Sequence, residues 1–139
     1  MIYLLDRNAL AAAMWGEADP ILDRLRAAAA EPAAVAVSGI VLFEVRYAIA
    51  RSRRKRQDAE RLRTLLSGIQ VVPFDANDAA VAGELRAALE TARTPMGLSE
   101  LFTAAQALRL GATVATTNPA EFAAVPGLTL ADWTSEPAG

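Results

Sequence analysis

Short apolar runs alternate along the chain with longer segments of helical periodicity. Residues 2–5, 34–38, 69–74 and 112–117 are apolar runs of strand length, and residues 128–130 are expected to add an edge strand. Helices are expected over residues 8–15, 20–30, 39–54, 58–66, 75–93 and 99–110. A long amphipathic pattern lies in residues 39–54, whose apolar face is expected to carry Ile40, Phe43, Tyr47 and Ala50.

Strands that alternate with helices of ten or more residues favour parallel pairing with right-handed crossovers. The pattern therefore predicts a three-layer α/β/α sandwich with a mainly parallel sheet of four or five strands. At 139 residues, of which 53% are hydrophobic, the chain is long enough for one domain with a sizeable core. We expect that domain to span residues 1–133, with residues 134–139 as a short flexible tail.

The composition removes several kinds of chemistry. The chain has no histidine and no cysteine, and Lys55 is its only lysine. A Ser-His-Asp triad, a cysteine nucleophile and His/Cys zinc sites are excluded, and Lys55 has no glycine-rich turn beside it that would make a P-loop. If the protein is an enzyme, its chemistry is expected to use carboxylates, arginines, hydroxyls and a hard metal ion bound through oxygen.

The net charge of −2 argues against a protein that coats nucleic acid through bulk positive charge. Basic residues nevertheless concentrate in one segment, where a solvated helix end and an RNA-phosphate contact are both compatible with the sequence. No apolar run reaches the roughly 18 residues of a membrane span, and the N-terminus does not resemble a signal peptide, so we expect a cytoplasmic protein without a membrane partner. The basic segment contains Arg51, Arg53, Arg54, Lys55 and Arg56.

Polar residues at the ends of predicted strands are the candidate site. Asp6 ends the first strand, Glu44 lies early in the helix after the second, and Asn118 follows the fourth. Glu100 lies in the first turn of a helix that follows a Pro-Gly break. Because functional sites of open parallel sheets lie at the carboxyl ends of the strands, these four residues are expected to converge. Each also has a structural interpretation, since Asp6 and Glu100 could serve helix N-termini and Asn118-Pro119 is an ordinary turn signal.

Four motifs are spread over nearly the whole chain. They are Leu4-Leu5-Asp6-x-Asn8-x-Leu10, Ser38-Gly39-Ile40-Val41-Leu42-Phe43-Glu44, Pro95-Met96-Gly97-x-x-Glu100-Leu101 and Val114-Ala115-Thr116-Thr117-Asn118 with Glu121-Phe122. In this order and spacing they resemble the motifs of PIN-domain toxins of the VapC family.

The resemblance implies a PIN fold, a site for one or two Mg²⁺ or Mn²⁺ ions, and endoribonuclease activity on structured RNA such as tRNA or ribosomal RNA. It also implies a VapB-type antitoxin as partner and a homodimer. Asp6, Glu44 and Glu100 match the family's first three acidic positions, which bind metal, and Asn118 matches the fourth. In such a site, Mg²⁺ lowers the pKa of a bound water for attack on the phosphodiester.

Two positions depart from the family pattern. Glu100 stands where Asp is usual, and Arg7 stands where Thr or Ser usually follows the first Asp. If Arg7 points into the site, it would pair with the carboxylates and compete with metal; if it points outward, it could bind substrate phosphate. The alternative to an active ribonuclease is therefore a catalytically impaired PIN-like protein that binds an antitoxin or RNA. A receiver-type signalling module is a weaker alternative. That class normally needs a lysine at the end of a late strand, and Lys55 is nowhere near one.

Overall fold

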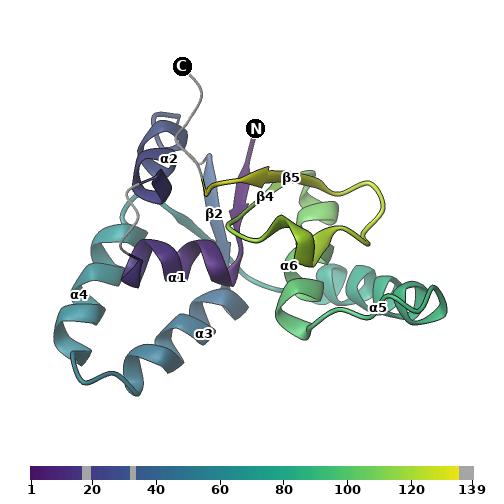
Figure 1. The fold of residues 1–139 in the computed structure, drawn as a ribbon, viewed down its shortest axis with the longest axis horizontal. Coiled ribbons are helices and arrows are strands. Elements are labelled where there is room, and N and C mark those ends of the chain that lie inside the picture. The colour runs from purple at the N-terminus through teal and green to yellow at the C-terminus, as the bar shows by residue number, and fades with distance from the viewer. Residues whose placement is uncertain (17–19, 32–33, 135–139) are drawn as a thin grey trace.

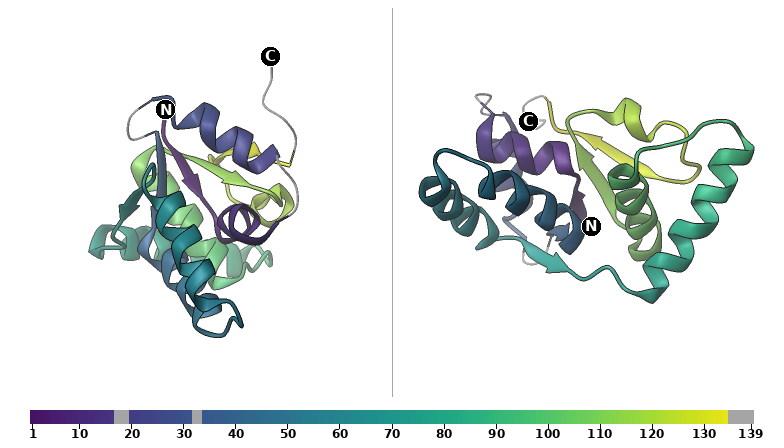
Figure 2. Two further views of the ribbon diagram at one scale, coloured as in Figure 1. Left: turned by 90° about the vertical axis from the view of Figure 1, so that its left-hand side faces the viewer. Right: turned by 90° about the horizontal axis from the view of Figure 1, so that it is seen from below.

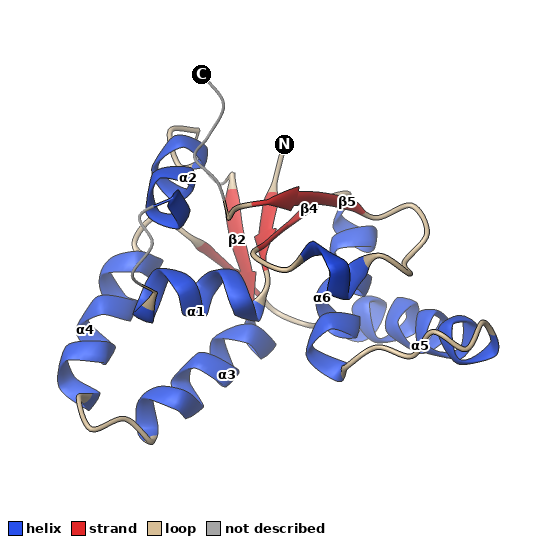
Figure 3. Ribbon diagram, in the orientation of Figure 1, coloured by secondary structure: helices blue, strands red, loops and turns tan. Residues whose placement is uncertain are grey.

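The computed structural model describes residues 1–16, 20–31 and 34–134. Secondary structure alternates along the chain as predicted (Figures 1 and 3). The strands are β1 (Tyr3–Leu5), β2 (Val35–Ser38), β3 (Gln70–Val72), β4 (Thr113–Thr116) and β5 (Thr129–Asp132). The helices are α1 (Arg7–Trp15), α2 (Pro20–Ala28), α3 (Gly39–Ala50), α4 (Lys55–Leu66), α5 (Ala76–Thr91), α6 (Leu98–Leu110) and the 3-10 turn η1 (Pro119–Phe122).

The five strands form one parallel sheet in the order β3-β2-β1-β4-β5. This confirms the predicted α/β fold class and its parallel sheet. The chain builds from β1 toward β2 and β3, then returns to place β4 on the other side of β1. The strand order therefore reverses between β1 and β4, and parallel α/β sheets bind ligands at the carboxyl edge of such a switch point.

Two apolar cores cover the two faces of the sheet. Leu5 faces a core with α1 to α4, whereas its neighbour Leu4 faces a second core with α6 and η1. Side chains alternate between the faces of a strand, which is why consecutive leucines enter different cores. Figure 1 shows the consequence: α1, α3 and α4 lie on one side of the strands, and α5 and α6 lie on the other. The right-hand view in Figure 2 shows the same separation.

Helix α3 differs from the prediction in its length and in its buried face. It ends at Ala50 rather than near Arg54, and α4 begins at Lys55. Its buried residues are Val41, Val45 and Ile49, whereas Phe43 and Tyr47 are exposed. The helix carries two apolar stripes on opposite sides, and the one with Val41, Val45 and Ile49 packs against the core.

Other boundaries moved by smaller amounts. The strand predicted over residues 69–74 is confined to Gln70–Val72, because Pro73 cannot donate a sheet hydrogen bond. The predicted tail of residues 134–139 lies, apart from Thr134, outside the described residues. No described helix has the length and apolar character needed to cross a membrane.

A buried polar network joins α5 to α6. Asp78, which has no exposed surface, forms an ion pair with Arg109 and accepts a hydrogen bond of 3.3 Å from Gln106. Gln106 also donates to the Pro73 carbonyl at 3.1 Å, which ties the loop before α5 to the same network. Burial alone would raise the pKa of Asp78, but the bonds from Arg109, the Asp75 backbone and Gln106 outweigh it and lower that pKa.

Candidate functional site

Asp6 lies at the carboxyl end of the central strand and begins helix α1. One carboxylate oxygen accepts the Ala9 N–H at 2.7 Å, and the other accepts the Thr116 hydroxyl at 2.5 Å. The capping interpretation is thus correct for Asp6, but it accounts for only one of the two oxygens. Because only 3% of the residue is exposed, burial raises its pKa more than the Thr116 and Ala9 bonds lower it. A buried carboxylate of this kind is stabilised by a nearby cation.

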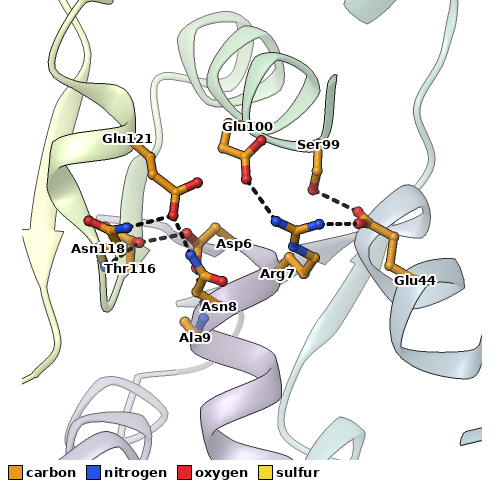
Figure 4. A network of polar contacts seen from close by, with 10 residues as sticks. All are labelled: Asp6, Arg7, Asn8, Ala9, Glu44, Ser99, Glu100, Thr116, Asn118 and Glu121. Carbon is orange, nitrogen blue, oxygen red and sulfur yellow. Dashed lines mark hydrogen bonds and ion pairs between the residues drawn. The ribbon is translucent and has the colours of Figure 1, made fainter. Parts of the chain in front are cut away.

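Arg7 supplies positive charge at the same place. Its guanidinium contacts Glu100 at 3.1 Å and Glu44 at 3.4 Å, joining residues from α6 and α3 (Figure 4). Ser99 donates to the second oxygen of Glu44 at 2.7 Å. About half of the Arg7 side chain is exposed, but its charged end points into the site rather than away from it.

Glu121 is a fourth acidic member of the site. Asn8 and Asn118 each donate to the same Glu121 oxygen at 2.7 Å. The backbone N–H of Asn118 in turn donates to the Thr116 hydroxyl at 2.9 Å, so the residues that follow β4 form a continuous hydrogen-bonded chain with Asp6. Asn118 therefore orients Glu121, as Figure 4 shows.

Glu100 and Glu121 line the same cleft, and each carboxyl alters the pKa of the other. Burial, together with Glu121, raises the pKa of Glu100. Hydrogen bonds from Glu100, Asn8 and Asn118 lower the pKa of Glu121. Glu100 thus holds the proton longer as the pH rises, and Glu121 is the carboxylate that ionises first.

The four carboxylates do not converge on one point: Glu44 and Glu100 bind Arg7, whereas Asp6 and Glu121 have other partners. Within the described parts of the chain, no group of three acidic side chains is arranged to bind a single metal ion. The guanidinium occupies the position of a cation between Glu44 and Glu100. The donors are nevertheless of the kind that a hard divalent ion prefers, since they are all oxygens.

A cleft of about 360 Å³ opens beside this acidic cluster. Residues 94–97 form one wall, and Ala120, Ala123 and Ala124 form the other, with Glu100 and Glu121 between them. A Cβ on Gly97 would lie 2.4 Å from a Glu100 oxygen, so only glycine leaves that carboxyl its present position. The Pro-Gly break thereby makes room for an acidic group beside the cleft.

The predicted basic segment lies at the turn between α3 and α4. Arg53, Arg54, Lys55 and Arg56 are exposed there. Two basic residues further along have structural contacts: Arg61 donates to the Ala13 carbonyl at 2.9 and 3.2 Å, and Arg63 pairs with Glu60 at 2.9 Å.

The predicted site residues lie side by side in two hydrogen-bonded groups (Figure 4). Glu44 and Glu100 bind Arg7, whereas Asp6 and Asn118 are joined through Thr116. The sequence interpretation did not include Thr116, Ser99 or Glu121 among the site residues. The same strand-end argument could have identified Thr116, which closes a buried strand, and Glu121, which follows it closely. Ser99 gave no separate signal, because a serine in the first turn of a helix is commonplace.

Comparison with known proteins identifies the family. The family model described as the PIN domain matches residues 3–128. Ribonuclease VapC2 of Rickettsia felis is 34% identical over 133 residues, which cover 96% of this chain and 98% of that protein. The tRNA(fMet)-specific endonuclease VapC of Salmonella typhimurium is 30% identical over 97 residues, covering 70% and 74% of the two chains.

A solved structure shows the same fold. The VapBC2 structure of Rickettsia felis, bound to a DNA fragment from the promoter, matches with a TM-score of 0.89 and 33% identity. The match covers 96% of this chain and 99% of that chain. The resemblance seen in the motifs is thereby confirmed: this chain belongs to the PIN-domain family and, within it, to the VapC ribonucleases.

Proposed function

We propose that this protein is the toxin of a type II toxin–antitoxin pair and acts as an endoribonuclease that depends on Mg²⁺ or Mn²⁺. The observation that carries the proposal is the convergence of Asp6, Glu44, Glu100 and Glu121 beside an open cleft. The four come from separate parts of the chain and meet at the switch point of the sheet. Relatives named as ribonucleases or endonucleases supply the reaction class.

The acidic side chains match a divalent cation in charge and in donor type. Asp6, Glu44 and Glu100 would hold it once the Arg7 guanidinium leaves the space between Glu44 and Glu100, with Glu121 close by. A bound divalent ion supplies an activated water and offsets charge that develops on the phosphate. PIN-family nucleases generally use such ions.

The chain's own residues prepare the site for that role. Thr116 and the Ala9 N–H fix both oxygens of Asp6, so this carboxylate has one orientation. Glu100, Asn8 and Asn118 lower the pKa of Glu121, and this carboxylate lines the cleft, where it would accept a proton from an attacking water. The cleft admits part of an RNA chain between residues 94–97 and η1.

The proposed partners are a VapB-type antitoxin, structured RNA and a second copy of the chain. The similarity to a solved VapBC complex supports the antitoxin. The relative named as a tRNA(fMet)-specific endonuclease supports a structured RNA substrate such as tRNA, with ribosomal RNA as the other class.

Cleavage of end-labelled tRNA and ribosomal RNA by the purified chain tests the function. We expect cleavage with Mg²⁺ or Mn²⁺, none in excess EDTA, and at least a hundredfold loss of rate in Asp6→Asn. Asp23→Asn is the matched control, because Asp23 lies in an exposed i,i+3 pair with Arg26, and it should retain full activity. Undiminished cleavage in EDTA would refute metal dependence.

A catalytically impaired protein is the second candidate, and the contacts of Arg7 with Glu44 and Glu100 favour it. If the wild-type chain is inactive, the double variant Arg7→Thr with Glu100→Asp restores the family pattern. Cleavage gained by that variant would support impairment of an otherwise intact site. If the double variant is also inactive, the site would support neither an active ribonuclease nor an impaired one.

A further inference from the structure

An exposed stack of aromatic and guanidinium groups runs along α3. Phe43 is 65% exposed and Tyr47 is 55% exposed, and their rings stack with centroids 6.5 Å apart and planes at 25°. The Arg51 guanidinium lies 5.5 Å from the Tyr47 ring centre and also donates to the Tyr47 hydroxyl at 3.2 Å. These three residues, four positions apart, form an aromatic ladder about 12 Å long at 1.5 Å per residue.

The ladder does not hold the helix to the protein. Val41, Val45 and Ile49 form the buried face of α3, and Phe43 and Tyr47 lie outside it. Two large rings left in water are unfavourable unless they bind something, so neighbouring exposed aromatics indicate a contact surface.

The ladder connects the acidic site to the basic turn. Glu44, the residue after Phe43, contacts Arg7 and Ser99 in the site. At the other end, Arg51 leads directly into the turn that carries the exposed residues Arg53, Arg54, Lys55 and Arg56. None of these four forms an ion pair with the residues that the structure describes.

We propose that the aromatic ladder stacks the bases of a single-stranded RNA segment whose backbone continues from the acidic site to the basic turn. The inference rests on the proposed ribonuclease function, which supplies RNA at the adjoining site. Aromatic rings and guanidinium planes stack on any base, and arginines beyond them neutralise phosphates. An apolar protein partner would match the rings alone, whereas RNA matches both the rings and the four positive charges.

The binding experiment uses the full chain carrying Asp6→Asn, so that RNA is bound but not cut. In this background, Phe43→Leu with Tyr47→Leu removes the two aromatic rings and keeps apolar bulk. Phe43→Ala with Tyr47→Ala removes the two rings and the apolar bulk. Trp15→Leu is the matched control, because Trp15 is 42% exposed and lies outside the ladder. The probes are a single-stranded RNA oligonucleotide and a duplex of the same length, with Kd measured by fluorescence anisotropy.

We expect both double variants to bind the single strand about tenfold more weakly for each ring removed. Duplex binding, the Trp15→Leu control and the oligomeric state by sedimentation should be unchanged. Arg53→Gln with Arg54→Gln should reduce the slope of log Kd against log salt by about 0.7 for each phosphate that these arginines neutralise in the wild type.

Unchanged single-strand affinity in the leucine double variant would overturn the proposal. The proposal would also be overturned if the alanine variant failed to form a dimer or an antitoxin complex that the leucine variant still forms. That result would assign the two side chains to a protein interface. If the wild type cleaves RNA and the leucine variant has the same kcat/KM, the proposed role of the ladder is wrong and the proposed ribonuclease function is supported. If the wild type never cleaves RNA but the Asp6→Asn chain needs the ladder to bind it, the proposed ribonuclease function is wrong and the role of the ladder is supported.

Discussion

At the scale of single residues, Arg7 supplies a fixed positive charge in the site. Its guanidinium bridges Glu44 and Glu100, whose side chains are 19% and 10% exposed. A divalent ion bound by the same carboxylates would have to compete with this fixed positive charge. Because nearly half of the Arg7 side chain reaches solvent, it can rotate away without unpacking the core.

We therefore predict that Arg7→Thr binds Mn²⁺ about tenfold more tightly than the wild type. The variant exchanges a competing cation for a hydroxyl and frees two carboxylates. Titration calorimetry with Mn²⁺ alone measures this without reference to activity. Arg86→Thr is the control, because Arg86 forms an exposed i,i+4 pair with Glu90 and lies outside the site. Equal or weaker Mn²⁺ affinity in Arg7→Thr would show that the arginine does not compete.

Asp6, Glu44 and Glu100 could be assigned to one sheet edge from the sequence, because strand ends and helix starts can be read from apolar runs. The sequence did not reveal that Glu121 lines the same cleft as Glu100. That placement depends on how η1 folds back over α6, and two residues 21 positions apart carry no local pattern that reports it.

At the scale of elements, the α5–α6 pair depends on a charge that is fully enclosed. Asp78 joins Arg109, Gln106 and the Asp75 backbone, so its removal leaves several donors without their acceptor. These contacts lower the pKa of Asp78 below its ordinary value.

We predict that Asp78→Asn lowers the free energy of unfolding by about 2 kcal/mol at neutral pH. A carboxyl whose pKa is lower in the folded state stabilises the fold above its unfolded pKa and loses that contribution as the pH falls through its folded value. The difference between wild type and variant should therefore shrink in acid. Urea unfolding at pH 7 and at acidic pH measures both effects.

Glu90→Gln, in the exposed Arg86 pair, should change the free energy of unfolding by less than about 0.5 kcal/mol. A difference between the wild type and Asp78→Asn that grows toward acid pH would contradict the assigned role of Asp78.

Helix α3 shows where prediction of an element fails. Ile40, Phe43, Tyr47 and Ala50 form one stripe at helical spacing, and Val41, Val45 and Ile49 form another. Periodicity identifies the helix in either case, but it cannot choose between two apolar faces about 180° apart at 3.6 residues per turn. Packing against α1 and α4 made that choice and left the aromatic face in solvent.

At the scale of the whole molecule, metal binding and folding should be linked. A ligand that binds only the folded chain stabilises it by about 2.7 kcal/mol at a concentration one hundred times its Kd. We therefore expect Mn²⁺ to raise Tm by several degrees, and EDTA to reverse the rise. Thermal unfolding followed by circular dichroism measures the effect.

Asp6→Asn is the informative variant for this linkage. It should abolish most of the Mn²⁺-dependent rise, because it removes a charged ligand. Without divalent ions it should melt at or above the wild-type Tm: burial raises the pKa of Asp6, so its ionised form destabilises the folded chain as the pH rises through that value. An equal rise of Tm with Mn²⁺ in the wild type and in Asp6→Asn would show that the ion binds elsewhere.

The sequence by itself determined the α/β class, the parallel sheet, the absence of His, Cys and P-loop chemistry, and the acidic strand ends. These follow from composition and from short-range periodicity, which backbone geometry translates directly into helices and strands. Tertiary structure decided which face of α3 is buried, that Arg7 turns inward, and that Glu121 lines the same cleft as Glu100. Those outcomes depend on contacts between residues far apart in the chain, where shape and charge in three dimensions select among arrangements that the local pattern permits equally.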